Sequence, residues 1–224
     1  MTETALKKSR SAKTDSSTGI SSAQARRDRT RRRILDSAKK IISRKGYEAA
    51  SVSDIVKNID MSQGIFYYHF KDKKAVLVEL LNEFFSAARQ MASTWAETTD
   101  TGADTAEQFY RSVAALLGDN RELAMIIRRE NFNSDPEIRK MIQDFYGFLY
   151  SRTEMALELG MSLGSVRKLD PAIAAVASIG MLKEVVFAML DRRGPIDIDR
   201  VMKEVTSIQN YGIRPADNLP DSNK

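Results

Sequence analysis

The chain has 224 residues, no cysteine and one histidine, and its 35 Lys and Arg residues against 30 Asp and Glu residues give a net charge of +5. A single histidine without cysteine cannot build a transition-metal site of the usual kind, so we expect no metal and no cofactor. The chain also lacks a glycine-rich phosphate loop and a paired-carboxylate constellation, so we expect no catalytic residues and no enzyme activity.

The first 24 residues are rich in Ser, Thr, Lys and Arg and hold almost no large apolar side chain. Such a segment cannot offset the entropy of ordering, which predicts a disordered basic arm over residues 1–24. The arm either follows DNA phosphates or merely keeps the chain in solution. No apolar stretch follows its charges, so it is not a secretory signal, and we expect a cytoplasmic protein.

A long amphipathic helix is predicted next, from about Ala25 to Lys45. Its apolar stripe repeats at helical spacing through Ile34, Leu35, Ala38, Ile41 and Ile42. Gly46 follows the last turn, where glycine commonly ends a helix. The first turns carry six arginines between positions 26 and 33, a run that is often only a solvated face but that here adjoins the next motif.

Residues 51–70, SVSDIVKNIDMSQGIFYYHF, predict two short helices joined by a tight turn. Ser51 with Asp54 forms a capping-box pattern, and Asp60 is a residue type that tolerates the left-handed conformation at a helix end. Ser62 can cap the second helix. Phe66 and Phe70 share one side of that helix and should anchor it, which leaves the other side chains free to face outward.

The positive charge of the chain is confined to its N-terminal third. Residues 1–74 hold 18 Lys and Arg against 8 Asp and Glu, a net of +10, and the rest of the chain holds 17 against 22, a net of −5. Neutralising phosphates releases counterions and supplies most non-specific affinity for DNA. The distribution therefore predicts a DNA-binding domain joined to a mildly acidic one.

Residues 26–81 resemble the DNA-binding domain of the tetracycline-repressor (TetR) family of bacterial transcription regulators. The resemblance rests on the apolar stripe, Gly46-Tyr47, Ser51, Met61-Ser62 and above all the spacing G-x-F-Y-x-H-F-x-x-K from Gly64 to Lys73. It implies an all-α fold: a three-helix helix-turn-helix domain followed by a helical effector-binding and dimerisation domain.

The resemblance also implies which residues contact double-stranded DNA. Gln63, Ile65 and Tyr68 would face base edges, and Ser51, Tyr67, His69 and Lys73 would bind phosphates. Gly64 would let the backbone approach closely, and Ser53 and Ser62 are also expected to contact DNA. Asp60 departs from the family, which commonly has glycine there, and Ser53 stands where some members carry a longer side chain.

Beyond this domain the punctuation predicts further helices, with Pro136 and Pro171 in first turns. The expected ranges are 73 to past 95, 105–117, 120–132, 135–159, 171–191 and 197–209. The expected domains are a basic arm (1–24), a DNA-binding domain (25–71), a ligand-binding and dimerisation domain (72–211) and a flexible tail (212–224).

The resemblance implies that the second domain holds the dimer together and encloses an effector. Close packing of small residues predicts a homodimer interface at Ala174, Ala177, Ser178, Met181, Val201 and Val205, although these helices could equally complete the core of one subunit. The apolar run 172–182 is too short to cross a membrane. Soft apolar side chains and one cation suggest a pocket at Trp95, Phe109, Met125, Arg129, Phe132, Phe145, Phe148 and Met181.

These patterns predict a ligand-responsive repressor that binds a palindromic operator as a dimer and is released by a small apolar or acyl-type effector. Two alternatives stay open: an architectural protein that binds DNA without sequence preference, and a basic membrane-surface protein.

Overall fold

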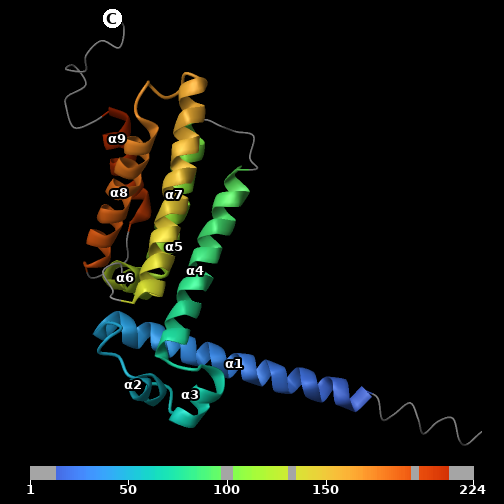
Figure 1. Cartoon of the computed structure of the whole chain (residues 1–224). Helices are drawn as coiled ribbons and strands as arrows, with labels where there is room; N and C mark the ends of the chain where they lie inside the picture. Colours follow the sequence, from blue (N-terminus) through green and yellow to red (C-terminus); the bar gives the residue numbers. More distant parts are fainter. Residues whose placement is uncertain (1–13, 97–102, 131–134, 193–196, 212–224) are drawn as a thin grey trace, which may run out of the picture. The chain divides into compact units, whose positions relative to one another are not determined.

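The computed structural model describes residues 14–96, 103–130, 135–192 and 197–211. All regular secondary structure in these ranges is helical, which confirms the predicted all-α fold. The chain divides into two compact units, Met1–Leu77 and Val78–Lys224. Each unit is described by itself, and the helices are labelled in Figure 1. The predicted C-terminal tail and the first half of the predicted arm lie outside the described residues.

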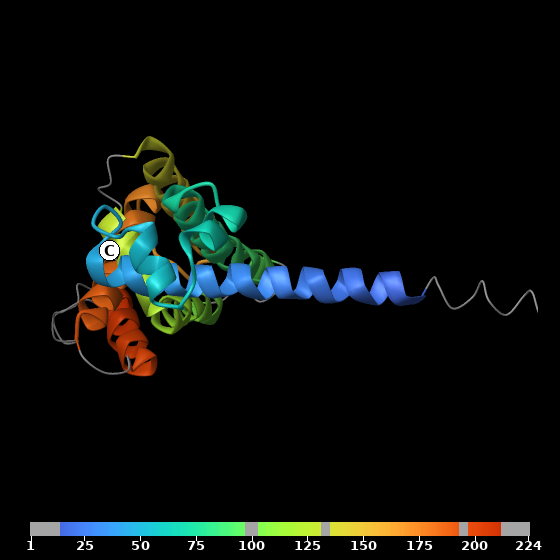
Figure 2. The same cartoon turned by 90° about the horizontal axis from the view of Figure 1, so that it is seen from below.

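The first unit is built from α1 (Thr14–Lys45), α2 (Val52–Lys57), α3 (Gln63–His69) and the start of α4 (Lys73–Ala96). The helix α1 begins eleven residues before the predicted start, so residues 14–24 are helical and the prediction of a disordered arm was wrong there. Residues 14–24 hold mostly Ser, Thr, Asp and Gly, which have low helix propensity, and the hydrogen bond from Gln24 to Asp28 at 2.8 Å supports the helix only at the C-terminal end of this part. Figure 2 shows this N-terminal part extending past α2 and α3.

The core of the first unit joins one face of α1 to α2 and α3. The side chains of Ile34, Ile55 and Phe66 are fully buried, and Phe70 is 3% exposed, which confirms the predicted anchors of α3. Ser37 is a buried polar residue in this core. Its hydroxyl donates to the carbonyl of Ile55 at 2.7 Å and accepts from the Asn58 side chain, so burial leaves no polar atom of this pair unsatisfied.

Local chemistry sets the ends of these helices as predicted. Gly46 has a φ of +83° immediately after α1, and Asp60 has a φ of +53° in the turn between α2 and α3. Ser51 and Asp54 form a reciprocal capping box on α2, and the Ser62 hydroxyl accepts from the Ile65 amide at the start of α3. The turn is therefore fixed by one capping serine and one left-handed residue.

In its described residues, the second unit contains the rest of α4 and five further helices. These are α5 (Ala103–Asp119), α6 (Arg121–Glu130), α7 (Pro136–Ser162), α8 (Pro171–Leu190) and α9 (Ile198–Tyr211), all within a few residues of the predicted ranges. Asp135 and Asp170 cap α7 and α8, and each is followed by proline in the first turn, as predicted. The α7 and α8 helices pack against each other along their length (Figure 1).

The helix α8 matches the predicted range 171–191 and is long and apolar enough to cross a membrane by length and composition, because its apolar stretch continues past the run 172–182 to Leu190. The expectation that this segment is too short was therefore wrong. A single helix of this kind is weak evidence for a span, since core helices of soluble proteins share the property. One third of the apolar window is buried inside the unit, so much of the helix surface faces outward.

Candidate functional site

The helix α3 presents its predicted reading side chains to the outside. Tyr68 is 67% exposed, Tyr67 is 55% exposed and Ile65 is 40% exposed, and Gln63 is also exposed. Large aromatic surfaces exposed side by side on a seven-residue helix are costly in water unless they meet a partner. The buried Phe66 holds this surface in place from below.

Two arginines of α1 fix the position of α3 and its preceding turn. The Arg31 guanidinium donates to the carbonyl of His69 at 2.7 Å and lies 4.2 Å from the ring centroid of Phe70. Arg33 donates to the carbonyl of Ile59 at 3.0 Å. Part of the basic run is thus structural, and sequence reasoning missed this role because the partners lie 26 and 38 residues away.

Arg27 belongs to the same run and lies beside the exposed face of α3. Its guanidinium carbon is 5.3 Å from the ring centroid of Tyr68. Arg26 and Arg29 are exposed on α1. Positive charge therefore borders the exposed tyrosines of α3, as an anionic partner requires.

Lys73 has a different position from the one expected of a phosphate ligand. Its ammonium donates to the carbonyl oxygens of Tyr47, Glu48 and Ala50, and it lies 4.2 Å from the ring centroid of Tyr47. An ammonium has three donors, so a phosphate contact would have to replace one of these bonds. Lys73 therefore stabilises the segment between α1 and α2.

The hydroxyl of Ser51 is likewise engaged within the fold. It accepts from the Asp54 amide and donates to the Asp54 carboxylate at 2.8 Å, and Lys45 pairs with the same carboxylate at 2.8 Å. Hydrogen bonds from Lys45 and Ser51 hold the pKa of Asp54 well below its usual range. Ser53 is half-buried and Ser62 is exposed at its cap.

Burial and the neighbouring charges of Arg27 and Arg31 lower the pKa of His69 from its ordinary value. The imidazole is therefore neutral at neutral pH and offers one N–H donor. Gly64 is exposed and has an ordinary φ, and a Cβ placed on it would meet only the Ser62 hydroxyl oxygen at 3.8 Å. The fold itself does not require glycine there, which leaves a close external approach as its use.

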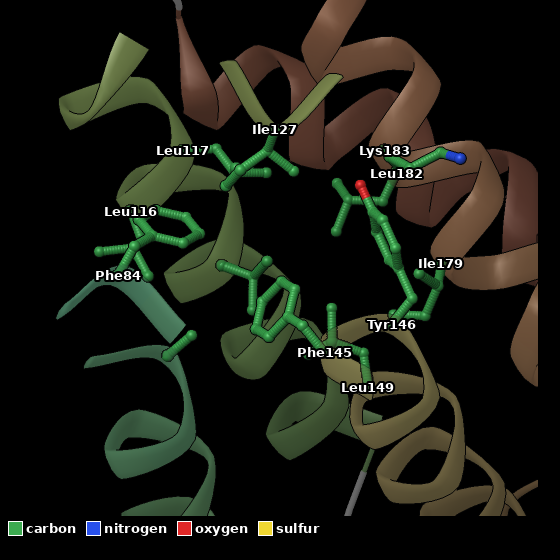
Figure 3. A pocket seen from close by; sticks show the side chains of 12 residues that line it. Phe84, Leu116, Leu117, Ile127, Phe145, Tyr146, Leu149, Ile179, Leu182 and Lys183 are labelled. Carbon is green, nitrogen blue, oxygen red and sulfur yellow. The ribbon is translucent and has the colours of Figure 1, made fainter. Parts of the chain in front are cut away.

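The second unit encloses a cavity of about 30 Å³ among α4, α5, α6, α7 and α8 (Figure 3). Apolar side chains dominate its wall, with Phe84 of α4 and Phe145 of α7 facing each other at 6.1 Å between ring centroids. The remaining apolar lining consists of Ala88, Val113, Leu116, Leu117, Ile127, Leu149, Ile179 and Leu182.

Of the predicted pocket residues, Phe145 lines this cavity. Met125, Phe148 and Met181 are half-buried away from its wall, and Arg129 is exposed. The side chains of Trp95, Phe109 and Phe132 lie outside the described residues. Among the described residues, Phe145 is thus the predicted pocket residue that lines this cavity, and periodicity could not give the others because it does not say which helices surround a space.

The polar members of the wall are Tyr146 and Lys183, which sequence reasoning missed. Tyr146 follows the predicted Phe145, and a lysine inside the apolar α8 run is the signal that could have singled out Lys183. Burial, with smaller effects of Tyr150 and Glu184, raises the pKa of Tyr146 well above its usual range. The cation Arg128, by contrast, pairs with Asp191 outside the cavity wall.

The predicted dimer residues divide between the core and the surface. Val201 and Val205 are 8% and 1% exposed, so they complete the core of one subunit and cannot form an interface. Ala177 is exposed, and Ala174, Ser178 and Met181 are half-buried. The same side of α8 also exposes Ile173 and Val176, by 69% and 52%, which the prediction did not include.

Within the described residues, no group of three His, Cys, Asp or Glu side chains is arranged to hold a metal ion. The described residues offer two features suited to recognition: an exposed aromatic and basic surface in the first unit and an apolar cavity with two polar groups in the second.

Known proteins that are similar to this chain include bacterial transcriptional regulators. Residues 34–80 match the model of the bacterial regulatory proteins of the tetR family. The chain is 28% identical over 195 residues to the uncharacterized HTH-type transcriptional regulator YdgC of Bacillus subtilis, covering 84% of this chain and 95% of that protein. It is 24% identical to the fatty acid metabolism regulator protein of the same species, covering 80% and 93%.

Solved structures share the fold. The transcriptional regulator FadR from Bacillus subtilis, determined in complex with stearoyl-CoA, superposes with a TM-score of 0.66 at 22% identity and covers 81% of this chain and 98% of its own.

Proposed function

This chain belongs to the TetR family of bacterial regulatory proteins and is a DNA-binding transcriptional regulator, and we propose that it represses transcription as a homodimer released by an acyl-type effector. The observation that carries the proposal is the exposed pair Tyr67 and Tyr68 on α3, bordered by arginines of α1.

Sequence recognition is assigned to the exposed side of α3. Gln63, Ile65 and Tyr68 are proposed to face base edges in the major groove, with Gly64 allowing close approach. Tyr67, His69 and the exposed Arg26 and Arg29 are proposed to contact phosphates. The engaged hydroxyl of Ser51 and ammonium of Lys73 support a mainly structural role for these two residues.

The DNA assignment is tested by selecting binding sites for the full chain from random duplex DNA. We expect a palindromic site bound at least about 10³-fold more tightly than bulk DNA. Tyr68→Ala should lose this preference while circular dichroism stays unchanged, and the exposed Gln143→Ala on α7 should keep it. Selection without enrichment would instead support an architectural protein that binds DNA without sequence preference.

The homodimer is proposed to form through the outward side of α8. Ile173, Val176 and Ala177 expose apolar surface there, and Ile208 of α9 is 38% exposed. Contiguous exposed apolar patches are commonly buried when subunits associate. A two-fold interface would bury the same patch of both subunits. Two recognition helices would then meet half-sites about 34–36 Å apart.

Sedimentation of the full chain tests the interface. The variant carrying Ile173→Glu and Val176→Glu should be monomeric, because two carboxylates per subunit would be buried without partners. Leu163→Glu places a charge on another exposed apolar residue of the same unit and should leave the dimer intact. A monomeric wild-type chain at micromolar concentration would exclude the proposed dimer.

An acyl-type effector is proposed because the cavity wall is apolar, and because relatives include a fatty acid metabolism regulator and a regulator solved with stearoyl-CoA. The described cavity has room for about two water molecules, whereas ligand pockets measure about 300–1,000 Å³. The effector would therefore bind an expanded conformation and shift the population toward it. The affinity of the selected DNA site should fall when a long-chain acyl compound is added.

A further inference from the structure

The cavity wall is polar at one place. Tyr146 of α7 and Lys183 of α8 lie together beside Leu182 and Ile179, as Figure 3 shows, and the Lys183 ammonium is 5.3 Å from the ring centroid of Tyr146. The opposite side, formed by Phe84 and Leu116, is apolar. A cavity with one polar end matches a ligand with one polar end.

The hydroxyl of Tyr146 is a donor without an acceptor. Within the part of the chain that the structure describes, it takes part in no hydrogen bond, and the side chain is half-buried. Its raised pKa keeps the phenol protonated at every physiological pH. Among the described residues, the fully buried side-chain polar atom without a hydrogen-bond partner is Oγ1 of Thr153, so water can reach the Tyr146 hydroxyl. A ligand acceptor at this position would replace water as the partner of the phenol.

Lys183 offers positive charge at the same place. Its side chain is 25% exposed, and its ammonium pairs with Glu184 at 3.3 Å. The carboxylate of Glu184 is 68% exposed, so this pair contributes little to stability and a ligand anion could replace it at low cost. The stem of Lys183 meanwhile belongs to the wall, and its ammonium points away from the apolar side chains (Figure 3), so the charge reaches the end of the apolar space by a rotation of this flexible side chain.

We propose that Tyr146 and Lys183 form the head-group site of the effector cavity and bind an anionic oxygen at the end of an apolar chain. This inference rests on the proposed function and names the ligand class, an apolar chain that carries an anionic group at one end. The anionic group is either the carboxylate of a free fatty acid or a phosphate of an acyl thioester. The phenol donates one hydrogen bond, and the ammonium supplies charge and a second donor.

Direct binding to the full chain tests this proposal without DNA. Three probes share a ten-carbon chain: decanoate, decanoyl-CoA and the uncharged 1-decanol. Isothermal titration should give at least one anion a dissociation constant about tenfold lower than that of decanol, equivalent to about 1.4 kcal/mol. Tight binding of decanoate identifies the carboxylate as the source of the charge, and tight binding of decanoyl-CoA alone identifies the thioester.

The variant Lys183→Gln should raise the dissociation constant of the anion about tenfold and leave that of decanol unchanged. Tyr146→Phe should raise it about threefold to tenfold. Two matched controls are Lys168→Gln, an exposed lysine of the same unit, and Tyr150→Phe, whose ring stacks on Tyr146 but does not line the cavity. Both should bind like the wild type, and thermal denaturation verifies that all variants are folded.

Three results would overturn the head-group site: no anion binds, decanol binds as tightly as the anions, or Lys183→Gln changes all three probes equally. Each leaves the selection of a DNA site untouched, so the failure of this site is distinguishable from failure of the regulator itself. If the chain selects no DNA site but Lys183→Gln still weakens the binding of the anions alone, the head-group site stands and the proposed DNA-binding function fails.

Discussion

Replacing Lys73 by methionine should weaken the fold of the first unit and leave the salt dependence of DNA binding nearly unchanged. The ammonium bonds to the carbonyls of Ala50 at 2.8 Å, Glu48 at 3.3 Å and Tyr47, and it lies over the Tyr47 ring. Methionine keeps much of the apolar stem but removes the charge and all three donors.

The magnitude follows from burial. The carbonyls of Tyr47 and Ala50 are partly buried, and that of Glu48 is exposed and contributes little. A hydrogen bond from a charged donor contributes about 1.5–3 kcal/mol, and water can reach both carbonyls after the substitution, so the lower end applies to each. We expect a loss of about 2–3 kcal/mol, a large part of the stability of a domain of this size.

Urea denaturation followed by circular dichroism measures this loss, with Lys40→Met as the matched control because Lys40 is exposed on α1. The slope of log affinity for DNA against log salt measures phosphate contacts, and losing one contact reduces it by about 0.9. A Lys73→Met protein as stable as the control but with the slope reduced by one contact would refute the structural role and restore the phosphate role.

Local geometry predicts the effects of substitutions at three further residues, Asp60, Asp54 and Gly160. Asp60→Gly should stabilise the protein by about 0.5–1 kcal/mol, because glycine removes the strain of the left-handed backbone at position 60, and this gain exceeds the added entropy of the unfolded chain. Asp60→Asn keeps the preference for the left-handed conformation and removes the negative charge, so it should raise only the affinity for DNA. Asp54→Asn should lower the free energy of unfolding at pH 7, because a carboxylate whose pKa is lowered by folding stabilises the folded state in its charged form. Urea titrations should show the difference in stability between the two proteins shrinking as the pH falls below about 4, where the carboxylate becomes protonated in the unfolded wild-type chain. Gly160→Ala should cost about 1–3 kcal/mol in thermal denaturation, because the new Cβ would lie 2.6 Å from a methyl carbon of Val166, and Gly147→Ala, which meets nothing within 4 Å, should not destabilise.

The helix ends were predictable because their causes lie within four residues. Ser51 with Asp54, Ser62, Gly46 and Asp60 each act on backbone groups next to them, so the sequence alone contains both partners of every interaction. The start of α1 was missed because the hydrogen bonding that continues a helix past its packed part carries no apolar signal.

Contacts between distant residues were not predictable in the same way. Periodicity marks which side of a helix is buried, but it does not identify the helix against which that side packs. The apolar side of α9 was therefore assigned to a partner subunit, whereas Val201 and Val205 pack inside their own. The helix α8 is apolar on almost every side, so its pattern could not separate the buried Ile179 from the exposed Ile173.

The proposed effector would act on DNA binding through α4, because this helix continues from the first unit into the second. Lys73 at its first residue holds the segment between α1 and α2, and Phe84, about 16 Å further along the helix, lines the cavity. Converting a population from 1:99 to 99:1 takes about 5.5 kcal/mol of differential binding. Burying one methylene contributes about 0.8 kcal/mol, so a chain of about seven methylenes that binds only the expanded cavity would suffice. Shorter acyl chains should therefore bind yet release DNA incompletely, and a response independent of chain length would show that the apolar cavity is not the site that controls DNA binding.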